Sequence, residues 1–310
     1  MIDNIDKYDV VIGYGIGENY YKLRNVLKKL KIFDYVADRK WNCTDEKKFD
    51  GYDIISIEKI YDMEKVLIIV IPDRDDIFDT IKKTYLCDVI SIYDILNYKK
   101  CITGIQLRQE YNGIYEDVFN NKIVFDSTIP DNVRIKFTGE NAIVYIGENI
   151  NVLGYIDIVI DDEGYCKLGN GSFIGEVAVF VAHARLIIGK DCLLSYGITL
   201  RTHDGHHIFD ATTKKRINSP KDVIVGDKVW IGHNVALLPG TNIGNGSILG
   251  YGAVTSSQFG ENKLIAGCPA RVLRDNIIWS RDNTGWFDRN SIDECLDQSA
   301  LGYYEKIKEN

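Results

Sequence analysis

Several features that mark nucleic-acid, membrane and zinc proteins are missing from this sequence. The chain of 310 residues carries a net charge of −8, whereas dedicated nucleic-acid binders show a basic patch or stripe. No apolar run approaches the length of a membrane span, and the opening residues, MIDNIDKYDVVIG, lack a signal-peptide pattern. The seven cysteines form no CxxC pair. We therefore expect reduced thiols, no metal, and a cytoplasmic protein without nucleic-acid partners or membrane insertion.

What the sequence does contain is a period of six between residues 223 and 254. Aliphatic residues keep this spacing at Val225, Ile231, Leu237, Ile243 and Leu249, and a glycine directly follows all of them except Leu237. A helix repeats every 3.6 residues and a strand every two. A period of six with adjacent glycines indicates hexapeptide repeats, in which three short faces make one triangular coil of a parallel β-helix. The alternative is a set of buried strands in an ordinary sandwich.

The same period predicts further coils upstream. It places inward-pointing residues, or rungs, at Leu168, Ile174 and Phe180, at Ile188, Leu194 and Leu200, and more weakly at Ile146, Val152 and Ile158. Each buried aliphatic side chain contributes roughly 1.5–3 kcal/mol, so the column is expected to be the main source of stability. The segment 118–145 is rich in β-branched residues and is expected to form irregular first coils that cap the open end.

Strands and helices alternate over residues 1–97, which predicts a small parallel α/β domain. We expect strands within 8–17, 33–37, 65–71 and 89–92, and helices at 18–30, 75–86 and 93–98. The segment 98–117 is interpreted as a linker with one helical segment. The tail, 276–310, is expected to carry a helix that starts at Ser291, where Ser291 and Glu294 form a capping box.

A glycine-rich turn follows the first predicted strand. Gly13, Gly15 and Gly17 lie between that strand and a helix, where backbone N–H groups can bind a phosphate. Asp38 lies about 20 residues further on, the place of a ribose-binding acid. Glu18 replaces the third glycine of GxGxxG. A nucleotide or nucleotide-sugar site and a purely structural turn both stay open.

The period of six breaks at residues 202–222, a polar insertion that carries three of the five histidines. An excursion of this size from a regular scaffold is where function usually lies. Regular repeats resume at Val225 and continue to Val254, and a shorter excursion follows at 255–263.

Three stretches together resemble the hexapeptide-repeat acyltransferases. They are RTHDGHHIFD, VIVGDKVWIGHNVALLPGTNIGNGSILGYGAV and IAGCPARVLRDN, and they are most similar to the sugar O-acetyltransferases of bacterial capsule and lipopolysaccharide loci. The resemblance covers about residues 118–280. It implies a left-handed parallel β-helix over 118–275, after an N-terminal Rossmann-like α/β domain and before a C-terminal helical tail. It also implies a homotrimer that transfers an acetyl group from acetyl-CoA to a sugar hydroxyl.

The family pattern in the insertion is D-x-H followed by an aliphatic residue, an aromatic residue and Asp. It falls on Asp204, His206 and Asp210, with Ile208 and Phe209 between the last two. The resemblance implies that His206 is the general base. Asp204 would orient its ring, with Asp210 as the rival for that role. His203 and His207 are not required by the pattern. We expect them to be solvated loop residues, hydrogen-bonded packing residues, or residues that bind the acceptor.

The resemblance also implies a set of contacts to acetyl-CoA: Trp230, Gly232, His233, Gly250, Tyr251, Ser256, Arg271 and Arg274. Tyr251 replaces a small residue, which would narrow the pantetheine groove. Ser256 and Ser257 stand where a Thr-Lys pair is common in the family, which would remove one phosphate contact. Arg271 and Arg274 suit the bidentate binding of phosphates.

Three other functions stay open. The first is N-acetylation of an amino sugar attached to a nucleotide, which the N-terminal domain favours. The second is a metal lyase of the γ-carbonic-anhydrase type, with ligands among His183, His203, His206 and His207. Against it, that family lacks the VWIG…PAR segment that this chain contains. The third is a scaffold without catalysis, for which the substitution His206→Ala would change nothing.

Overall fold

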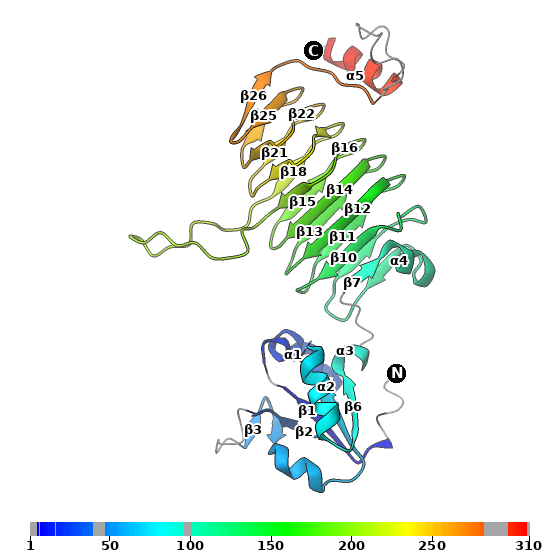
Figure 1. Cartoon of the computed structure of the whole chain (residues 1–310), viewed down its shortest axis with the longest axis vertical. Coiled ribbons are helices and arrows are strands. Elements are labelled where there is room, and N and C mark those ends of the chain that lie inside the picture. Colours follow the sequence, from blue (N-terminus) through cyan, green and yellow to red (C-terminus); the bar gives the residue numbers. More distant parts are fainter. Residues whose placement is uncertain are drawn as a thin grey trace. The chain divides into compact units, whose positions relative to one another are not determined.

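The computed structural model describes residues 5, 7–15, 17–39, 47–72, 74–95, 101–281 and 297–308. The chain divides into two compact units: Met1–Lys99 with Asp117–Phe119, and Lys100–Glu116 with Asn120–Asn310. Figure 1 shows the elements of both. In the part that the structure describes, no helix is both long and apolar enough to cross a membrane.

The first unit is built on a mostly parallel six-stranded sheet with the order β3–β4–β2–β1–β5–β6. Its elements are β1 (Val10–Tyr14), α1 (Glu18–Leu30), β2 (Tyr35–Ala37), β3 (Lys48–Phe49), β4 (Tyr52–Ile54), the 3-10 helix η3 (Ile57–Asp62), β5 (Val66–Val70), α2 (Asp75–Thr84), β6 (Asp88–Ser91) and α3 (Ile92–Ile95). The strand β5 is buried along its whole length. Its side chains alternate between two apolar clusters, one shared with α1 and the other with α2, so helices cover both faces.

The second unit is a parallel β-helix. Its repeating coils are formed by β15 (Arg185–Ile188), β16 (Leu193–Leu194) and β17 (Ile198–Arg201), then β18 (Val223–Val225), β19 (Trp230–Ile231) and β20 (Ala236–Leu237), then β21 (Asn242–Ile243), β22 (Ile248–Leu249) and β23 (Val254–Thr255). Each strand pairs in parallel with the strand three places later, so one coil lies on the next. The last strands are β24 (Gln258–Phe259), β25 (Leu264–Gly267) and β26 (Ala270–Arg274).

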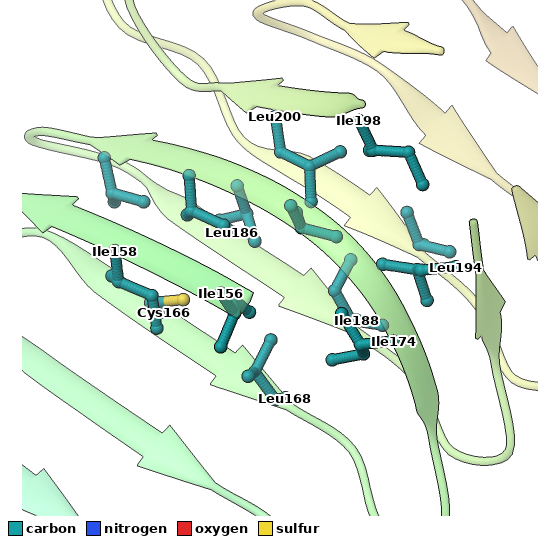
Figure 2. Packing of buried hydrophobic residues seen from close by; sticks show 14 of the residues in the cluster. Ile156, Ile158, Cys166, Leu168, Ile174, Leu186, Ile188, Leu194, Ile198 and Leu200 are labelled. Atoms are coloured by element: carbon teal, nitrogen blue, oxygen red, sulfur yellow. The ribbon is translucent and has the colours of Figure 1, made fainter. Parts of the chain in front are cut away.

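The aliphatic rungs fill the inside of the β-helix, as the period of six predicts. Ile231, Leu237, Ile243 and Leu249 are fully buried, and Val225 is 1% exposed. Figure 2 shows Ile174, Ile188 and Leu194 among the side chains that point into this core. The sandwich alternative is therefore wrong, because the strands stack as coils of a single column.

One predicted rung is wrong. Phe180 lies on the outer side of β14 (Phe173–Val181), and the inward residues of this strand are Ile174, Val177, Val179 and Val181. The period of six ends at Gly175. After it, β14 continues as one strand in which buried and partly exposed side chains alternate every two residues. An exact count of six therefore fails where one strand continues past a corner.

The first coils are irregular. They consist of β9 (Lys122–Val124), β10 (Val133–Phe137), β11 (Ile143–Ile146), β12 (Asn151–Ile160) and β13 (Tyr165–Leu168). The predicted linker at 98–117 instead contributes β7 (Cys101–Thr103), α4 (Gly104–Glu110) and β8 (Ile114–Glu116) to the β-helix. β7 pairs with β10, and β8 pairs with β9. A Cβ on Gly104 would lie 1.8 Å from the carbonyl oxygen of Pro130, so this contact requires glycine.

The C-terminal segment packs on the β-helix. The Trp279 indole donates to the carbonyl of Lys228 at 2.9 Å, and the Arg281 guanidinium donates to the carbonyls of Gly171 and Cys192. The buried Lys228 ammonium lies 3.7 Å from Asp297, just before α5 (Gln298–Lys308). The predicted capping box at Ser291 and Glu294 lies outside the described residues.

Candidate active site

The polar insertion, residues 202–222, forms an extended arm between β17 and β18. It is the yellow-green loop that projects from the β-helix in Figure 1. Its base is fixed, because the buried Thr202 hydroxyl accepts from the Ala182 N–H at 3.0 Å and its carbonyl accepts from the Lys221 N–H. Further out, an antiparallel bridge between Phe209 and Arg216 makes the arm a hairpin.

Asn218 organises the part of the arm that carries the DGH motif. Its side-chain nitrogen donates to the Asp204 carboxylate at 2.9 Å and to the His206 carbonyl at 2.8 Å. Its side-chain oxygen accepts from the Ile208 N–H at 2.8 Å. The His206 side chain is exposed on this braced segment. Asn218 therefore links the Asp204 carboxylate to the backbone of His206.

His203 is half-buried at the base of the arm. Its Nδ1 accepts a hydrogen bond from the Gly205 N–H at 3.1 Å. Burial, followed by the positive charge of Arg201, lowers the pKa of His203. A neutral ring with Nδ1 as acceptor fits both observations, so His203 supports the turn directly before His206.

Asp210 and His207 lie further along the arm. The Asp210 carboxylate accepts from the N–H groups of Thr212 and Thr213, and these bonds hold its pKa below the usual range. It caps the hairpin turn at the end of the arm. The exposed His207 ring lies 6.0 Å from the ring of Phe209.

Three residues predicted to contact acetyl-CoA lie at one corner of the β-helix, between the β16–β19–β22 and β17–β20–β23 faces. His233 stacks on Tyr196 with ring centroids 5.6 Å apart. Tyr251, 74% exposed, accepts a hydrogen bond from Asn234 at 2.8 Å, and Gly250 precedes it. Tyr196, His233 and Tyr251 lie on successive coils, and together they form an exposed aromatic corner.

The other predicted acetyl-CoA residues are spread around this corner. Trp230 projects outward from β19, 6.0 Å from the ring of Trp279, and Gly232 follows this strand. Ser256 is exposed in the turn after β23. Arg271 and Arg274 are exposed on β26.

The aromatic corner and the arm lie at opposite ends of one face. β17 begins beyond the Tyr196 turn and ends at Arg201, where the arm starts. A four-residue strand spans roughly 13 Å. Within a single chain, these two parts of the candidate site are therefore separated by the width of a face.

The first unit contains a cleft of about 630 Å³ at the carboxyl ends of β1, β2 and β5. The residues that line it are Tyr14, Gly15, Gly17, Asp38, Arg39, Pro72, Arg74, Asp76, Ile77 and Thr80. Three of the four residues predicted to bind a nucleotide are in this set; Gly13 is not, and it packs against Phe33. In parallel sheets such a cleft lies where the strand order reverses, here between β1 and β5.

The histidines proposed for a metal lyase do not gather. Within the described ranges, no three His, Cys, Asp or Glu side chains lie as they would to hold a metal ion. His183 lies 3.8 Å from Glu163 instead.

Known proteins resemble the β-helical unit. The family model "Bacterial transferase hexapeptide (six repeats)" matches residues 222–257. A polysialic acid O-acetyltransferase of Neisseria meningitidis is 34% identical over 49% of this chain and 71% of its own length. The chain belongs to the hexapeptide-repeat acyltransferases.

Two further members extend the comparison. A polysialic acid O-acetyltransferase of Escherichia coli O1:K1 is 33% identical over 44% of this chain, but the match spans only 45% of that relative's length. The crystal structure of the polySia-specific acetyltransferase NeuO shares 33% identity with a TM-score of 0.56, covering 61% of this chain and 84% of that one.

Two residues of this acyltransferase's candidate site were missed from the sequence. Asn218 lies 14 residues from Asp204, and no periodic rule links the two. Tyr196 sits in a turn one coil before His233, so the predicted coil spacing could have aligned them. Arg39 and Arg74 in the first unit's cleft were missed as well.

Proposed function

We propose that this protein transfers an acetyl group from acetyl-CoA to a hydroxyl of an acidic bacterial surface polysaccharide, with a sialic-acid polymer as the first acceptor to test. The relatives' names support the acceptor and the O-acetyl product. The observation that carries the proposal is the DGH segment, held by Asn218 and presenting His206 to solvent. The five described free cysteines fit a reducing cytoplasm.

His206 acts as the general base in this proposal. Its imidazole accepts the proton of the acceptor hydroxyl while that oxygen attacks the carbonyl carbon of the thioester. The tetrahedral intermediate then collapses, the C–S bond breaks, and the imidazolium returns the proton to the CoA sulfur. Asp204, fixed by Asn218, stabilises the imidazolium. Asp210 is the weaker candidate because its carboxylate caps a turn.

The test is the substitution His206→Ala, with Lys215→Ala on the same arm as the matched control. Removing a general base costs about 10²–10⁴-fold in rate. We expect kcat for acetyl transfer to a sialic-acid polymer to fall by this factor in His206→Ala and to stay unchanged in Lys215→Ala, with CoA release and O-acetyl mass increments as readouts. Equal rates in all three proteins would refute the role of His206 and leave the scaffold alternative.

We also propose that the site is completed between copies of the chain in a homotrimer. The aromatic corner and the arm are a face apart within one chain. The arm also exposes Ile208, Phe209 and Ile217, each by about half or more. A three-fold arrangement would cover these side chains and set the arm of one subunit beside the corner of the next.

Mixed assemblies test this arrangement. Two variants, each expected to be inactive, are unfolded and refolded together in equal amounts: His206→Ala in the arm and His233→Ala in the corner. Random mixing restores about a quarter of the sites, because each site takes one arm and one corner from different chains. A light-scattering mass of one chain, or no recovered activity, would show that each chain contains its own site.

The cleft of the first unit favours a second candidate function, N-acetylation of an amino sugar on a nucleotide. The cleft combines Gly15, Gly17 and Asp38 with two arginines, Arg39 and Arg74, the second of which is paired with Asp76. These groups suit a phosphate and a ribose, as in a Rossmann-like domain. Isothermal titration with UDP- and dTDP-linked amino sugars separates the two functions: binding followed by N-acetylation supports the second, and O-acetylation of polymer alone supports the first.

A further inference from the structure

At the base of the arm, Arg201 has no counter-ion among the residues that the structure describes. It is the last residue of β17, and its guanidinium lies over the ring of Phe180, 5.3 Å from the centroid. Its Nε is buried and makes no hydrogen bond within the described residues. A buried charged donor is normally paired, so the site is suited to an anion from outside the chain.

Arg134 shows what a paired arginine looks like on the same outer face. It also lies over an aromatic ring, that of Tyr155, with 4.9 Å to the centroid. Its guanidinium, however, forms an ion pair with Asp157 at 2.5 Å. Asp157 is the direct cross-strand neighbour of Arg134. The direct cross-strand neighbour of Arg201 is Phe180, followed in the same row by Val159, so no carboxylate lies at the equivalent place beside Arg201.

The guanidinium of Arg201 faces the proposed catalytic segment. Its Nη2 lies 3.8 Å from the position that a Cβ would take on Gly205, the residue before His206. Asp161 and Asp204 lie near His203, but among the described residues neither comes within ion-pair distance of Arg201. The Asp204 carboxylate accepts from Asn218, and that of Asp161 accepts from the Asp162 N–H.

We propose that Arg201, positioned by Phe180, binds a carboxylate of the acceptor glycan and so sets the sugar hydroxyl beside His206. This inference rests on the proposed acetyl transfer and adds a specificity: acidic acceptors over neutral ones. Arginine suits the task because its planar fork binds a carboxylate through two hydrogen bonds, and stacking on Phe180 restricts its orientation. A CoA phosphate has related oxyanion chemistry, and the experiment separates the two sources.

The experiment compares wild type with Arg201→Gln, Arg201→Lys and the matched control Arg134→Gln. The acceptors are an α2,8-linked oligosialic acid and the same oligomer with its carboxylates converted to methylamides, which removes the charge without adding a hydroxyl. The kcat and KM values for acceptor and for acetyl-CoA are measured by CoA release. Acceptor binding is measured separately by calorimetry without acetyl-CoA.

On oligosialic acid, we expect Arg201→Gln to raise the acceptor KM about 10–100-fold, the cost of hydrogen bonds to a charged group. The kcat and the KM for acetyl-CoA stay near wild type, Arg201→Lys is intermediate, and Arg134→Gln is unchanged. On the methylamide oligomer, the acceptor KM of wild type rises to that of Arg201→Gln, because the carboxylate that Arg201 binds is gone.

Three results overturn the inference. The first is an unchanged acceptor KM in Arg201→Gln, and the second is that Arg201→Gln raises the acceptor KM on the methylamide oligomer as much as on oligosialic acid. The third is a rise in the KM for acetyl-CoA instead of the acceptor KM. If wild type acetylates neither oligomer, the proposed acceptor is wrong and calorimetry decides the role of Arg201. Oligosialic acid binding that Arg201→Gln loses and Arg134→Gln keeps then supports the carboxylate site; equal binding, or none by wild type, rejects it.

Discussion

Asn218 and Asp204, 14 residues apart, are joined by a hydrogen bond of 2.9 Å across the two limbs of the arm. The same amide group holds the carbonyl of His206 and the N–H of Ile208. One side chain therefore holds the Asp204 carboxylate before the proposed base and the backbone directly after it. Because the arm projects from the β-helix, core packing does not hold its residues in place. The hydrogen bonds of Asn218 hold them instead.

The substitution Asn218→Ala is expected to lower kcat by about 10–100-fold, since small misplacements of a catalytic group cost this much. The melting temperature should hardly move, because these bonds are exposed. Asn218→Asp keeps the acceptor for Ile208 but sets a second carboxylate beside Asp204, so it should be no more active than Asn218→Ala. Steady-state kinetics and calorimetry check both variants, and full activity in Asn218→Ala would contradict the bracing.

Truncating a rung of the β-helix should destabilise the second unit. Ile231 is fully buried, so Ile231→Ala is expected to reduce the free energy of unfolding by about 2–5 kcal/mol. Leu153→Ala, at a side chain 59% exposed, is the control and should cost less than about 0.5 kcal/mol. Denaturant titrations measure both, and equal losses would mean that the column is not the source of stability.

The docking of the C-terminal segment should weaken in acid. Although burial acts to raise it, the pKa of Asp297 is lowered from the usual 3.8 by the N–H groups of Arg281 and Ala300 and by Lys228. A carboxylate whose pKa is lower in the folded state stabilises above the unfolded value and loses that contribution as pH falls through the folded one. Burial lowers the pKa of Lys228, but this group stays protonated throughout the acid range.

The variant Asp297→Asn isolates this contribution. Its free energy of unfolding should be about 1–3 kcal/mol below that of wild type at pH 7, as expected when buried donors lose a charged acceptor. The difference should shrink toward zero below pH 3.8. A difference that does not change with pH would show that the charge of Asp297 is not what holds the segment.

Gly15→Ala should damage the cleft of the first unit. Gly15 has φ of +92°, and a Cβ there would lie 2.6 Å from Pro72. Gly51 has nearly the same φ, +93°, but open space around it, so Gly51→Ala carries the backbone strain without the clash. We expect nucleotide-sugar binding to be lost in Gly15→Ala and kept in Gly51→Ala, with transfer to polysaccharide retained in both. Calorimetry and CoA release are the measurements, and binding retained by Gly15→Ala would place the ligand elsewhere.

Much of the β-helix could be predicted from the sequence because its rule is local. An aliphatic residue at every sixth position stacks on its counterpart in the next coil, so the rungs from Val225 to Leu249 needed no knowledge of the rest of the chain. The rule failed at Phe180, where β14 passes a corner without ending. It also missed the segment 98–117, in which β7 joins the β-helix by pairing with β10, more than 20 residues away, and β8 joins it as a hairpin with β9.

The sequence by itself determined the coil period, the insertion of 202–222 and the DGH motif that names His206 and Asp204. Only the tertiary structure decided that Asn218 joins the two limbs of the arm, that Asp210 caps a turn, and that Arg201 lies over the ring of Phe180 with no counter-ion among the described residues. The physical reason is that periodicity records contacts that repeat along the chain. The partner of a single polar side chain depends on which distant segments the fold brings close together, and such a contact occurs once and produces no periodic pattern in the sequence.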